Sequence, residues 1–171
     1  RVLPQGEVGE LAGRAQFMMK GYYKQDDKTR DLFWHDKEGR LFFKSGDMGR
    51  IDEDGFVVLL DRKKDMIISG GFNVYAADIE ALLLKHPDVV DVAVIGIPSE
   101  QWGESPMALC VRRERATTDE AGIRDWANGQ LSKTQRLVAV EFRRSLPRST
   151  IGKIMKRELR EPYWAGRSAK I

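Results

Sequence analysis

One lysine near the end of this 171-residue sequence has neighbours suited to binding an anion. Lys153 follows Gly152 in the stretch PRSTIGKIMKRELR, so its ammonium could approach a phosphate as a point charge. Pro147 constrains the backbone ahead of Lys153, and Ser149 or Thr150 could cap a following helix. The stretch is not a Walker A loop, because that motif needs glycine at position 147 and Ser or Thr at position 154. These residues alone allow an anion-binding lysine or a solvated surface charge.

A second candidate is the aspartate in KSGDMGR, residues 44–50. Ser-Gly-Asp between two expected strands predicts a tight turn that exposes the Asp47 carboxylate. A carboxylate can accept hydrogen bonds from both hydroxyls of a ribose, as it does in dinucleotide sites. On local grounds alone, an aspartate that merely forms the turn is the commoner case.

The third candidate is the stretch DRKKDMIISGGFNVYAADIE, residues 61–80. Gly70-Gly71 predicts a hairpin loop without side chains, which would let a ligand approach the backbone closely. A turn with no role in binding would explain the two glycines equally. The five charged residues 61–65 predict either a solvated linker or a hinge. Hinges are a few residues at the ends of elements that absorb a change in φ and ψ.

Charge is distributed unevenly along the chain. Residues 133–171 carry eleven Lys or Arg against three Asp or Glu, a net charge of +8, whereas the rest of the chain has a net charge of −5. A basic end suggests phosphate, nucleic acid or an acidic surface as partner, but it also suits a merely soluble face.

Cysteine usage and hydropathy indicate the compartment. The sole cysteine, Cys110, lies in the apolar run MALCV, which predicts a buried and unreactive thiol. No disulfide can form within the chain, which suits a reducing compartment. We find no signal peptide and no apolar run near the ~20 residues that a membrane helix needs, so we expect a cytoplasmic protein without a transmembrane segment.

The elements that must position these residues differ between the two parts of the chain. In residues 1–60, DKEGR (36–40) and DEDGF (52–56) adjoin the apolar runs LFF and FVVLL, which predicts β-hairpins. We expect this part to be all-β and to belong to a larger sheet or barrel. Because the chain begins at Arg1, we expect a fragment.

After residue 64 the sequence alternates between strand and helix patterns. Ile79 and Leu83 recur at helical spacing, and Thr117 and Glu120 have the spacing of a capping box. The expected elements are a hairpin around Gly70-Gly71, a helix over 76–86, strands over 89–98 and 107–113, a helix over 117–131, a strand over 138–142 and a short helix after Gly152. This order, ββαββαβα, predicts a compact α+β domain of about 100 residues, in which helices and a mixed sheet form layers.

Four motifs in order along the chain are similar to those of one superfamily. They are GEVGEL with MMKGYY, SGDMGRIDEDGF, DRKKDMIISGGFNVYAADIE and LPRSTIGKIMKRELR. Together they resemble the C-terminal part of the adenylate-forming, AMP-binding enzymes, which include acyl-CoA synthetases, peptide-synthetase adenylation domains and beetle luciferases. The resemblance runs almost end to end and is most like a fatty-acid or aromatic-acid CoA ligase.

The resemblance implies an acid–thiol ligase when the chain is full length. Such enzymes join a carboxylic acid to ATP, with Mg²⁺, and the thiol of coenzyme A then displaces AMP to give a thioester. Residues 1–63 would end a large N-terminal domain, Lys64 would be the hinge, and residues 65–171 would form a small domain that rotates between the half-reactions. The family's phosphate loop and acyl pocket lie upstream, so we expect this fragment alone to be inactive.

The resemblance also assigns roles to residues at matching positions. Asp47 would bind the ribose hydroxyls of ATP, assisted by Arg62. Lys153 would bridge the substrate carboxylate and the α-phosphate, and it resembles lysines that an acetyltransferase silences. Gly70 and Gly71 would line the tunnel for the pantetheine arm of coenzyme A.

Further contacts with coenzyme A are implied more loosely. Trp102 resembles a tryptophan near the nucleotide of coenzyme A, and Arg136, with Lys133, could meet its phosphates. No metal ligand is assigned to this chain. The basic residues still expected on the surface are Lys156, Arg157 and Arg160.

The sequence departs from the family's pattern at several positions. Asp61 replaces a glycine, Ala76 a proline and Asp78 a glutamate, and KTQRLVAVEF lacks the usual Lys-x-Pro. Three alternatives stay open: an adenylation domain that loads a carrier protein, a basic nucleic-acid-binding module, and a regulatory or interaction domain. A nucleic-acid module would bind with a steep salt dependence and would leave Asp47 and Gly70-Gly71 unexplained, so we expect no nucleic acid as partner.

Overall fold

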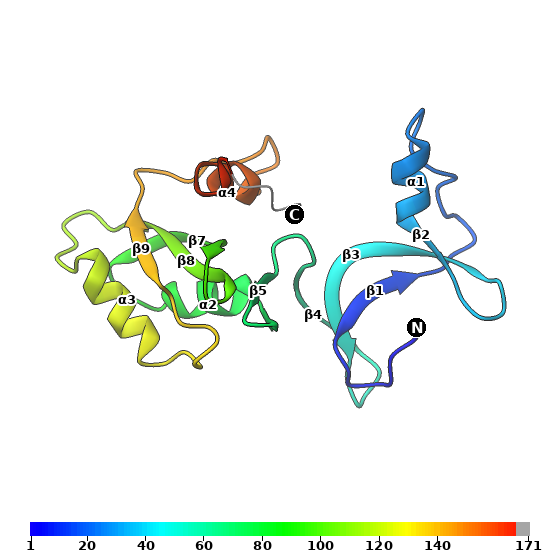
Figure 1. The fold of residues 1–171 in the computed structure, drawn as a ribbon, viewed down its shortest axis with the longest axis horizontal. Coiled ribbons are helices and arrows are strands. Elements are labelled where there is room, and N and C mark those ends of the chain that lie inside the picture. Colours follow the sequence, from blue (N-terminus) through cyan, green and yellow to red (C-terminus); the bar gives the residue numbers. More distant parts are fainter. Residues whose placement is uncertain (167–171) are drawn as a thin grey trace. The chain divides into compact units, whose positions relative to one another are not determined.

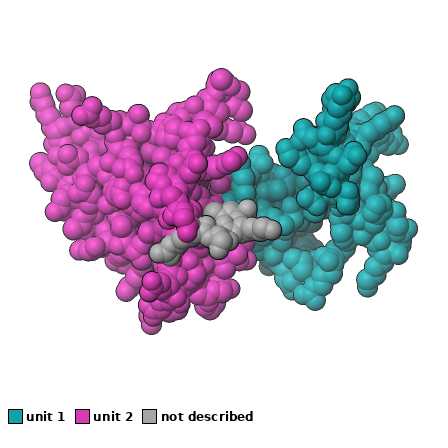
Figure 2. Space-filling view, turned by 45° about the horizontal axis from the view of Figure 1, so that its top comes forward, with its two compact units in different colours: residues 1–64 teal, residues 65–171 magenta. Residues whose placement is uncertain are grey.

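The computed structural model describes residues 1–166, which divide into two compact units (Figures 1 and 2). The first unit comprises Arg1–Lys64, and the second begins at Asp65. Residues 167–171, which end the expected mobile domain, lie outside the described residues. The assignment of Lys64 as a hinge, and of the two parts to different domains of a longer enzyme, stays a prediction.

The first unit is built around one long strand. Its elements are β1 (Gly9–Gly13), α1 (Asp26–Leu32), β2 (Phe33–His35), β3 (Leu41–Ile51) and β4 (Val57–Arg62). β1, β2 and β4 each pair antiparallel with β3. The two expected hairpins are confirmed: Asp36 Oδ1 accepts from Arg40 N and Asp52 Oδ1 accepts from Phe56 N, so each aspartate side chain closes its own turn.

The prediction that residues 1–60 are all-β is wrong, because helix α1 spans Asp26–Leu32. Its ends complement the helix dipole, with Asp26 and Asp27 in the first turn and Arg30 in the last. None of its residues is buried, so the sequence DDKTRDL has no apolar stripe from which a helix could be recognised.

The second unit has the predicted order of elements. They are β5 (Ile67–Ser69), β6 (Phe72–Val74), α2 (Ala76–Leu83), β7 (Val89–Ser99), β8 (Gly103–Arg112), α3 (Glu120–Asn128), β9 (Ala139–Phe142) and α4 (Lys156–Trp164). The strands lie in the order β6-β5-β8-β7, and β9 pairs with β8. The β8–β9 pairing is parallel and the others are antiparallel, which confirms a mixed sheet in an α+β fold.

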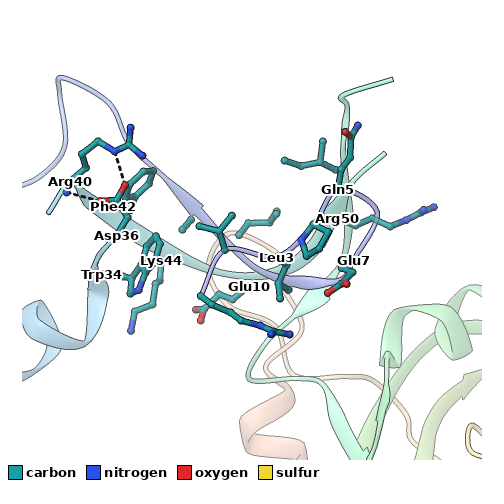
Figure 3. Close-up of a pocket in the computed structure, with 18 of the residues that line it drawn as sticks. Leu3, Gln5, Glu7, Glu10, Trp34, Asp36, Arg40, Phe42, Lys44 and Arg50 are labelled. Atoms are coloured by element: carbon teal, nitrogen blue, oxygen red, sulfur yellow. Dashed lines mark hydrogen bonds and ion pairs between the residues drawn. The ribbon is translucent and has the colours of Figure 1, made fainter. Parts of the chain in front are cut away.

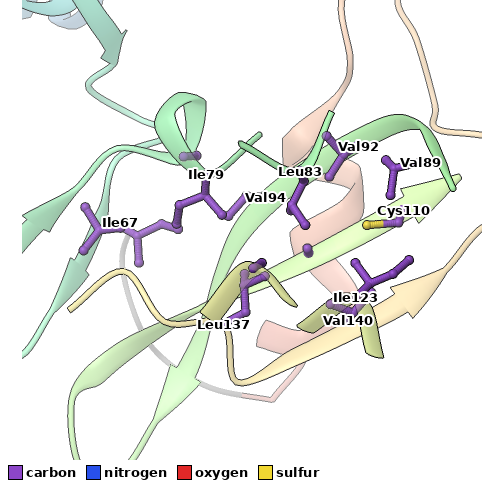
Figure 4. Close-up of a cluster of buried hydrophobic side chains, with 14 residues drawn as sticks. Ile67, Ile79, Leu83, Val89, Val92, Val94, Cys110, Ile123, Leu137 and Val140 are labelled. Atoms are coloured by element: carbon purple, nitrogen blue, oxygen red, sulfur yellow. The ribbon is translucent and has the colours of Figure 1, made fainter. Parts of the chain in front are cut away.

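The central sheet of the second unit is buried on both faces. Along β7 and β8, Val92, Val94, Ala108 and Cys110 pack with residues of α2 and α3 (Figure 4). Residues one step along these strands belong to a second cluster with residues of α4; they are Ala93, Ile95, Met107 and Leu109. Since successive side chains of a strand point to opposite faces, helices cover the sheet from both sides and form three layers (Figure 1).

Cys110 is fully buried between the sheet and its helices, as expected from its sequence. Burial raises the pKa of its thiol to about 12. A thiol that stays protonated is a poor nucleophile, so Cys110 is a packing residue.

The predicted capping box at Thr117 and Glu120 is wrong. The N-cap of α3 is Asp119, whose side chain accepts a hydrogen bond from Gly122 N. Thr118 is bound elsewhere: its N and Oγ1 donate to Asp88 Oδ2 at 3.0 and 2.6 Å. The cap comes from Asp119, two residues nearer the helix than Thr117, because its carboxylate reaches Gly122 N in the first turn.

The contact between Asp88 and Thr118 predicts a pH-dependent stability. Hydrogen bonds from the Thr118 side chain and backbone lower the pKa of the Asp88 carboxyl below its usual 3.8. A lowered pKa in the folded state stabilises the fold above the unfolded-state pKa, and this contribution is lost as the pH falls through the folded-state pKa. Thr118→Val should therefore lower the Tm at pH 7 and have a much smaller effect near pH 2, as measured by circular dichroism. Thr117→Val, at an exposed neighbouring site, is the matched control. An equal loss at both pH values would contradict the assignment.

Candidate functional site

Asp47 and Arg62 are held together by the pairing of β3 with β4. The two residues are partners in the strand register, and Arg62 Nε lies 2.8 Å from Asp47 Oδ1. The Asp47 N–H donates to Ser45 Oγ, and Gly46 between them has a φ of +74°, a conformation that favours glycine. The Asp47 side chain is 29% exposed, so its carboxylate is oriented by an arginine and still accessible to a ligand.

Lys64 lies in the turn that follows β4. Residues 63–65 form this turn, in which Lys63 N donates to Gly46 O at 2.9 Å and Lys63 Nζ forms an ion pair with Glu10 at 2.7 Å. The chain is therefore fastened to the first unit up to Lys63. The division between the units comes one residue later, after Lys64.

Gly70 and Gly71 form the turn of the β5–β6 hairpin, with φ of +58° and +82°. The structure brings Gly70 next to Trp102, whose carbonyl oxygen accepts from Gly70 N at 2.9 Å. A Cβ on Gly70 would lie 2.7 Å from Trp102 Cε3, whereas a Cβ on Gly71 would have no neighbour within 4 Å. The indole packs on the hairpin where a side chain is missing, and about half of it remains exposed.

Lys153 lies exposed in a tight turn before α4. Gly152, with a φ of +79°, donates from its N to Ser149 O at 2.9 Å. Ser149 N donates to Lys153 O at 2.8 Å, and Lys153 N donates to Ser149 Oγ at 3.2 Å. Ser149 thus closes this turn and does not cap a helix, since the N-cap of α4 is Met155 and makes no side-chain capping bond.

The expectation that Lys156 and Arg160 are surface residues is wrong. Lys156 Nζ lies 2.7 Å from Glu80 Oε1, with 13% and 19% of the two side chains exposed. Arg160 is buried and pairs with Glu104 at 3.4 Å. Helix α4 packs on the sheet and presents these two charges to carboxylates of α2 and β8, whereas Arg157 is exposed as expected.

Arg136 and Lys133 are exposed in the segment that joins α3 to β9. Ser132 and Gln135 organise this segment, because Ser132 Oγ donates to Gln135 Oε1 at 2.6 Å. The two basic side chains are therefore available to solvent. Their approach to coenzyme A stays a prediction.

A hollow within the first unit does not contain the candidate site. It has a volume of about 780 Å³ and is lined by residues of β1, β2, β3 and the N-terminal segment, among them Leu3, Trp34, Phe42 and Lys44 (Figure 3). Asp47 and Arg62 are not among its lining residues. Within residues 1–166, no group of three or more His, Cys, Asp or Glu could hold a metal ion, and no helix is long and apolar enough to cross a membrane.

These features define a class of protein. An α+β domain with a Gly-Gly hairpin and an exposed Gly-Lys turn, after a β unit with a paired aspartate and arginine, is the arrangement expected of the C-terminal part of an adenylate-forming enzyme. Residues 78–153 match the AMP-binding enzyme C-terminal domain, so the second unit contains a domain of this family. The fold and the recognition from sequence are thereby confirmed.

Relatives and solved structures extend the match over nearly the whole chain. The chain is 40% identical to 2-succinylbenzoate–CoA ligase of Geobacillus kaustophilus over 154 residues, which are 90% of this chain and 30% of the relative. It is 41% identical to the long-chain-fatty-acid–CoA ligase of Salmonella typhimurium over 156 residues, 91% of this chain and 27% of the relative. It superposes on ATP-bound MatB from Rhodopseudomonas palustris with a TM-score of 0.85 and 41% identity, covering 95% of this chain and 32% of that one. The chain therefore spans about 30% of the length of the proteins it matches.

The contact between Gly70 and Trp102 predicts unequal effects of alanine at the two glycines. Gly71→Ala should cost about 1 kcal/mol, the strain of a positive φ alone. Gly70→Ala should cost more, because its Cβ would also displace the indole. Urea unfolding followed by tryptophan fluorescence measures both. In a Trp102→Ala background the difference between Gly70→Ala and Gly71→Ala should shrink; a difference that is unchanged would mean that the indole is not its cause.

Proposed function

We propose that this chain is the C-terminal part of an ATP-dependent acyl-CoA synthetase. The observation that carries the proposal is the exposed Lys153, held in a self-closed turn of a domain that belongs to the AMP-binding enzyme C-terminal family. The two curated relatives named above are CoA ligases of different acids, which supports coenzyme A as acceptor. We propose a fatty or aromatic carboxylic acid as substrate and the cytoplasm as location.

In the first half-reaction, a carboxylate oxygen attacks the α-phosphorus of ATP, and the bond to the β-phosphate breaks to release pyrophosphate. The Lys153 ammonium would bridge the carboxylate and the α-phosphate, where negative charge concentrates in the transition state. Asp47 would accept hydrogen bonds from the ribose hydroxyls. Arg62, whose Nε lies 2.8 Å from Asp47 Oδ1, would hold the Asp47 carboxylate in place. Mg²⁺ bound to the phosphates would neutralise part of their charge.

In the second half-reaction, the thiol of coenzyme A attacks the acyl carbon, and AMP leaves with the bonding electrons. The Gly70-Gly71 turn would line the path of the pantetheine arm, since Gly71 has no side chain and no neighbour within 4 Å of a Cβ. Trp102 and Arg136 would meet the nucleotide end of coenzyme A. A rotation of the second unit at Lys64 would withdraw the Lys153 turn from the reacting atoms after adenylation and bring this hairpin there for thioester formation.

The first unit bears apolar side chains that a larger domain would cover. Phe56, Val57 and Leu59 are 70%, 58% and 65% exposed around β4. Clustered exposed apolar residues mark surfaces that pack against another partner. Because the chain spans about 30% of its relatives, we propose that the partner is a preceding N-terminal domain of the same enzyme and that this chain alone does not turn over substrate.

Two alternatives from the sequence are less well supported. A domain that loads a carrier protein would share the adenylation chemistry, but the two relatives named above are CoA ligases. A nucleic-acid-binding module is disfavoured because two of its basic residues, Lys156 and Arg160, are engaged by carboxylates within the domain.

A pyrophosphate-release screen of the full-length protein tests the proposed function. Fatty and aromatic acids are supplied with ATP and Mg²⁺, with coenzyme A present or withheld. Pyrophosphate release that depends on the acid, together with thioester formation only when coenzyme A is present, is the expected result. Adenylate formation without any thioester product would favour a different acceptor, and no pyrophosphate release with any acid would refute the assignment.

Lys153→Ala in the full-length enzyme should block adenylation and spare the second half-reaction. Removing one preorganised donor to the developing charge costs about 10²–10³ in rate. Thioester formation from preformed acyl-adenylate should proceed at the normal rate, as measured by rapid quench. Equal losses in both half-reactions would remove the proposed role.

Gly71→Leu provides the converse variant for the same assays. Its side chain should obstruct the pantetheine arm and slow only thioester formation, with adenylation unchanged.

We also propose that an acetyltransferase can modify Lys153, because the side chain is exposed. Acetylation would remove the positive charge that adenylation requires.

A further inference from the structure

One guanidinium connects the Lys153 turn to the central sheet. Arg148 lies five residues before Lys153, and its Nη1 donates to Gly152 O at 2.8 Å. Its Nη2 donates to Asp91 Oδ2 at 2.5 Å. Asp91 lies on β7, so the arginine fork joins the backbone next to Lys153 to a strand that is distant in sequence.

The anchor on β7 adjoins buried residues of the sheet. Val92 and Ala93, which follow Asp91, are buried on opposite faces of the sheet. β7 pairs with β8 along its length, and Asp91 Oδ1 accepts from Val92 N at 3.1 Å. Both carboxylate oxygens are therefore engaged, one by its own strand and the other by Arg148.

The other side of the turn is anchored by packing. Ile154 packs on the cluster that joins the sheet to α4, and it forms a β-bridge with Arg148. Between these two anchors the turn itself is exposed, and Ile151 at its tip is 75% exposed. Without the Arg148 side chain, the turn would be held by the packing of Ile154, by the hydrogen bonds to Ser149 and by the bond from Met155 N to Pro147 O at 2.8 Å.

We propose that Arg148 and Asp91 are positioning residues that hold the backbone of Lys153 for adenylation. The inference rests on the proposed role of Lys153 and adds the residues through which the domain aims it. A misplacement of about 1 Å, even from a change far from the reacting atoms, can cost 10²-fold in rate. The Arg148 side chain is 45% exposed, and half-exposed ion pairs add little to global stability, so the clamp acts on local order.

Another ion pair of the same domain provides a matched control. Arg124 and Asp125 on α3 are 2.8 Å apart, and the Arg124 side chain is 38% exposed, similar to Arg148. Asp125 is the next residue along the same helix, so this pair joins no separate segments. Arg124→Ala removes an arginine of similar exposure without releasing the Lys153 turn.

The first measurement concerns the turn alone and needs no activity. In this chain, Arg148→Ala should lower the NMR order parameters of Gly152 and Lys153 from about 0.85, typical of a rigid backbone, to about 0.6 or less. The order parameter of Leu109 in the core, and the Tm, should change little. Arg124→Ala should leave the turn unchanged. Unchanged order parameters in Arg148→Ala would overturn the proposal.

The second measurement concerns the full-length enzyme. Arg148→Ala and Asp91→Ala should each lower kcat for adenylation by about 10- to 100-fold with a small change in the KM for ATP. Thioester formation from preformed acyl-adenylate should be normal. Arg148→Lys should recover part of the rate, because an ammonium can reach one acceptor but lacks the fork that binds both.

The outcomes separate this inference from the proposed function. If Lys153→Ala does not impair adenylation, the proposed role of Lys153 is wrong, and the positioning role of Arg148 and Asp91 is wrong with it. If Lys153→Ala blocks adenylation but Arg148→Ala has a normal rate, only the positioning role fails. Equal losses in both half-reactions for Arg148→Ala would indicate a general structural role and would also overturn the proposal.

Discussion

The burial of β7 and β8 on both faces is the constraint on which the second unit depends. Strand side chains alternate, so one face of the sheet receives α2 and α3 and the other receives α4. Fully buried side chains such as Ile95, Leu109 and Cys110 make this arrangement costly to change, because removing a large buried side chain costs about 2–5 kcal/mol. The Lys153 turn enters α4, and the Gly70-Gly71 hairpin continues the same sheet through β5. One loop is thus part of the sheet, and the other is attached to it through the packing of α4.

Charged contacts specify how α4 is attached to this layer. Apolar packing through Leu159 is non-directional and would tolerate rotation of the helix. Lys156 with Glu80 and Arg160 with Glu104 add directional contacts on the same helix. Partly buried ion pairs contribute little net stability after desolvation, so we infer that their main effect is on orientation. Glu80 also accepts from Val94 N at 2.7 Å on β7, a strand at the edge of the sheet.

Sequence patterns located the elements well where burial is periodic. The helix around Ile79 and Leu83, the strands around Val94 and Leu109 and the order ββαββαβα all follow from apolar periodicity, which reports burial directly. The patterns failed where local chemistry was ambiguous. Helix α1 has no buried side, and several hydroxyl or carboxylate residues before α3 could serve as its cap. A turn residue such as Ser149 can bind several nearby backbone groups, and only the surrounding fold selects one of them.

The sequence by itself determined the family, the turns that contain glycine and the lysine that follows Gly152. It did so because motif order and residue type are properties of the chain alone. Only the tertiary structure decided which charges are engaged. Lys156 and Arg160 look as solvated as Arg157 in the sequence, and Arg148 has no local partner for its second nitrogen. Their carboxylates come from α2, β7 and β8, up to seventy-six residues away in the chain. Such pairings depend on how the sheet and helices pack, so no local pattern of residues could have predicted them.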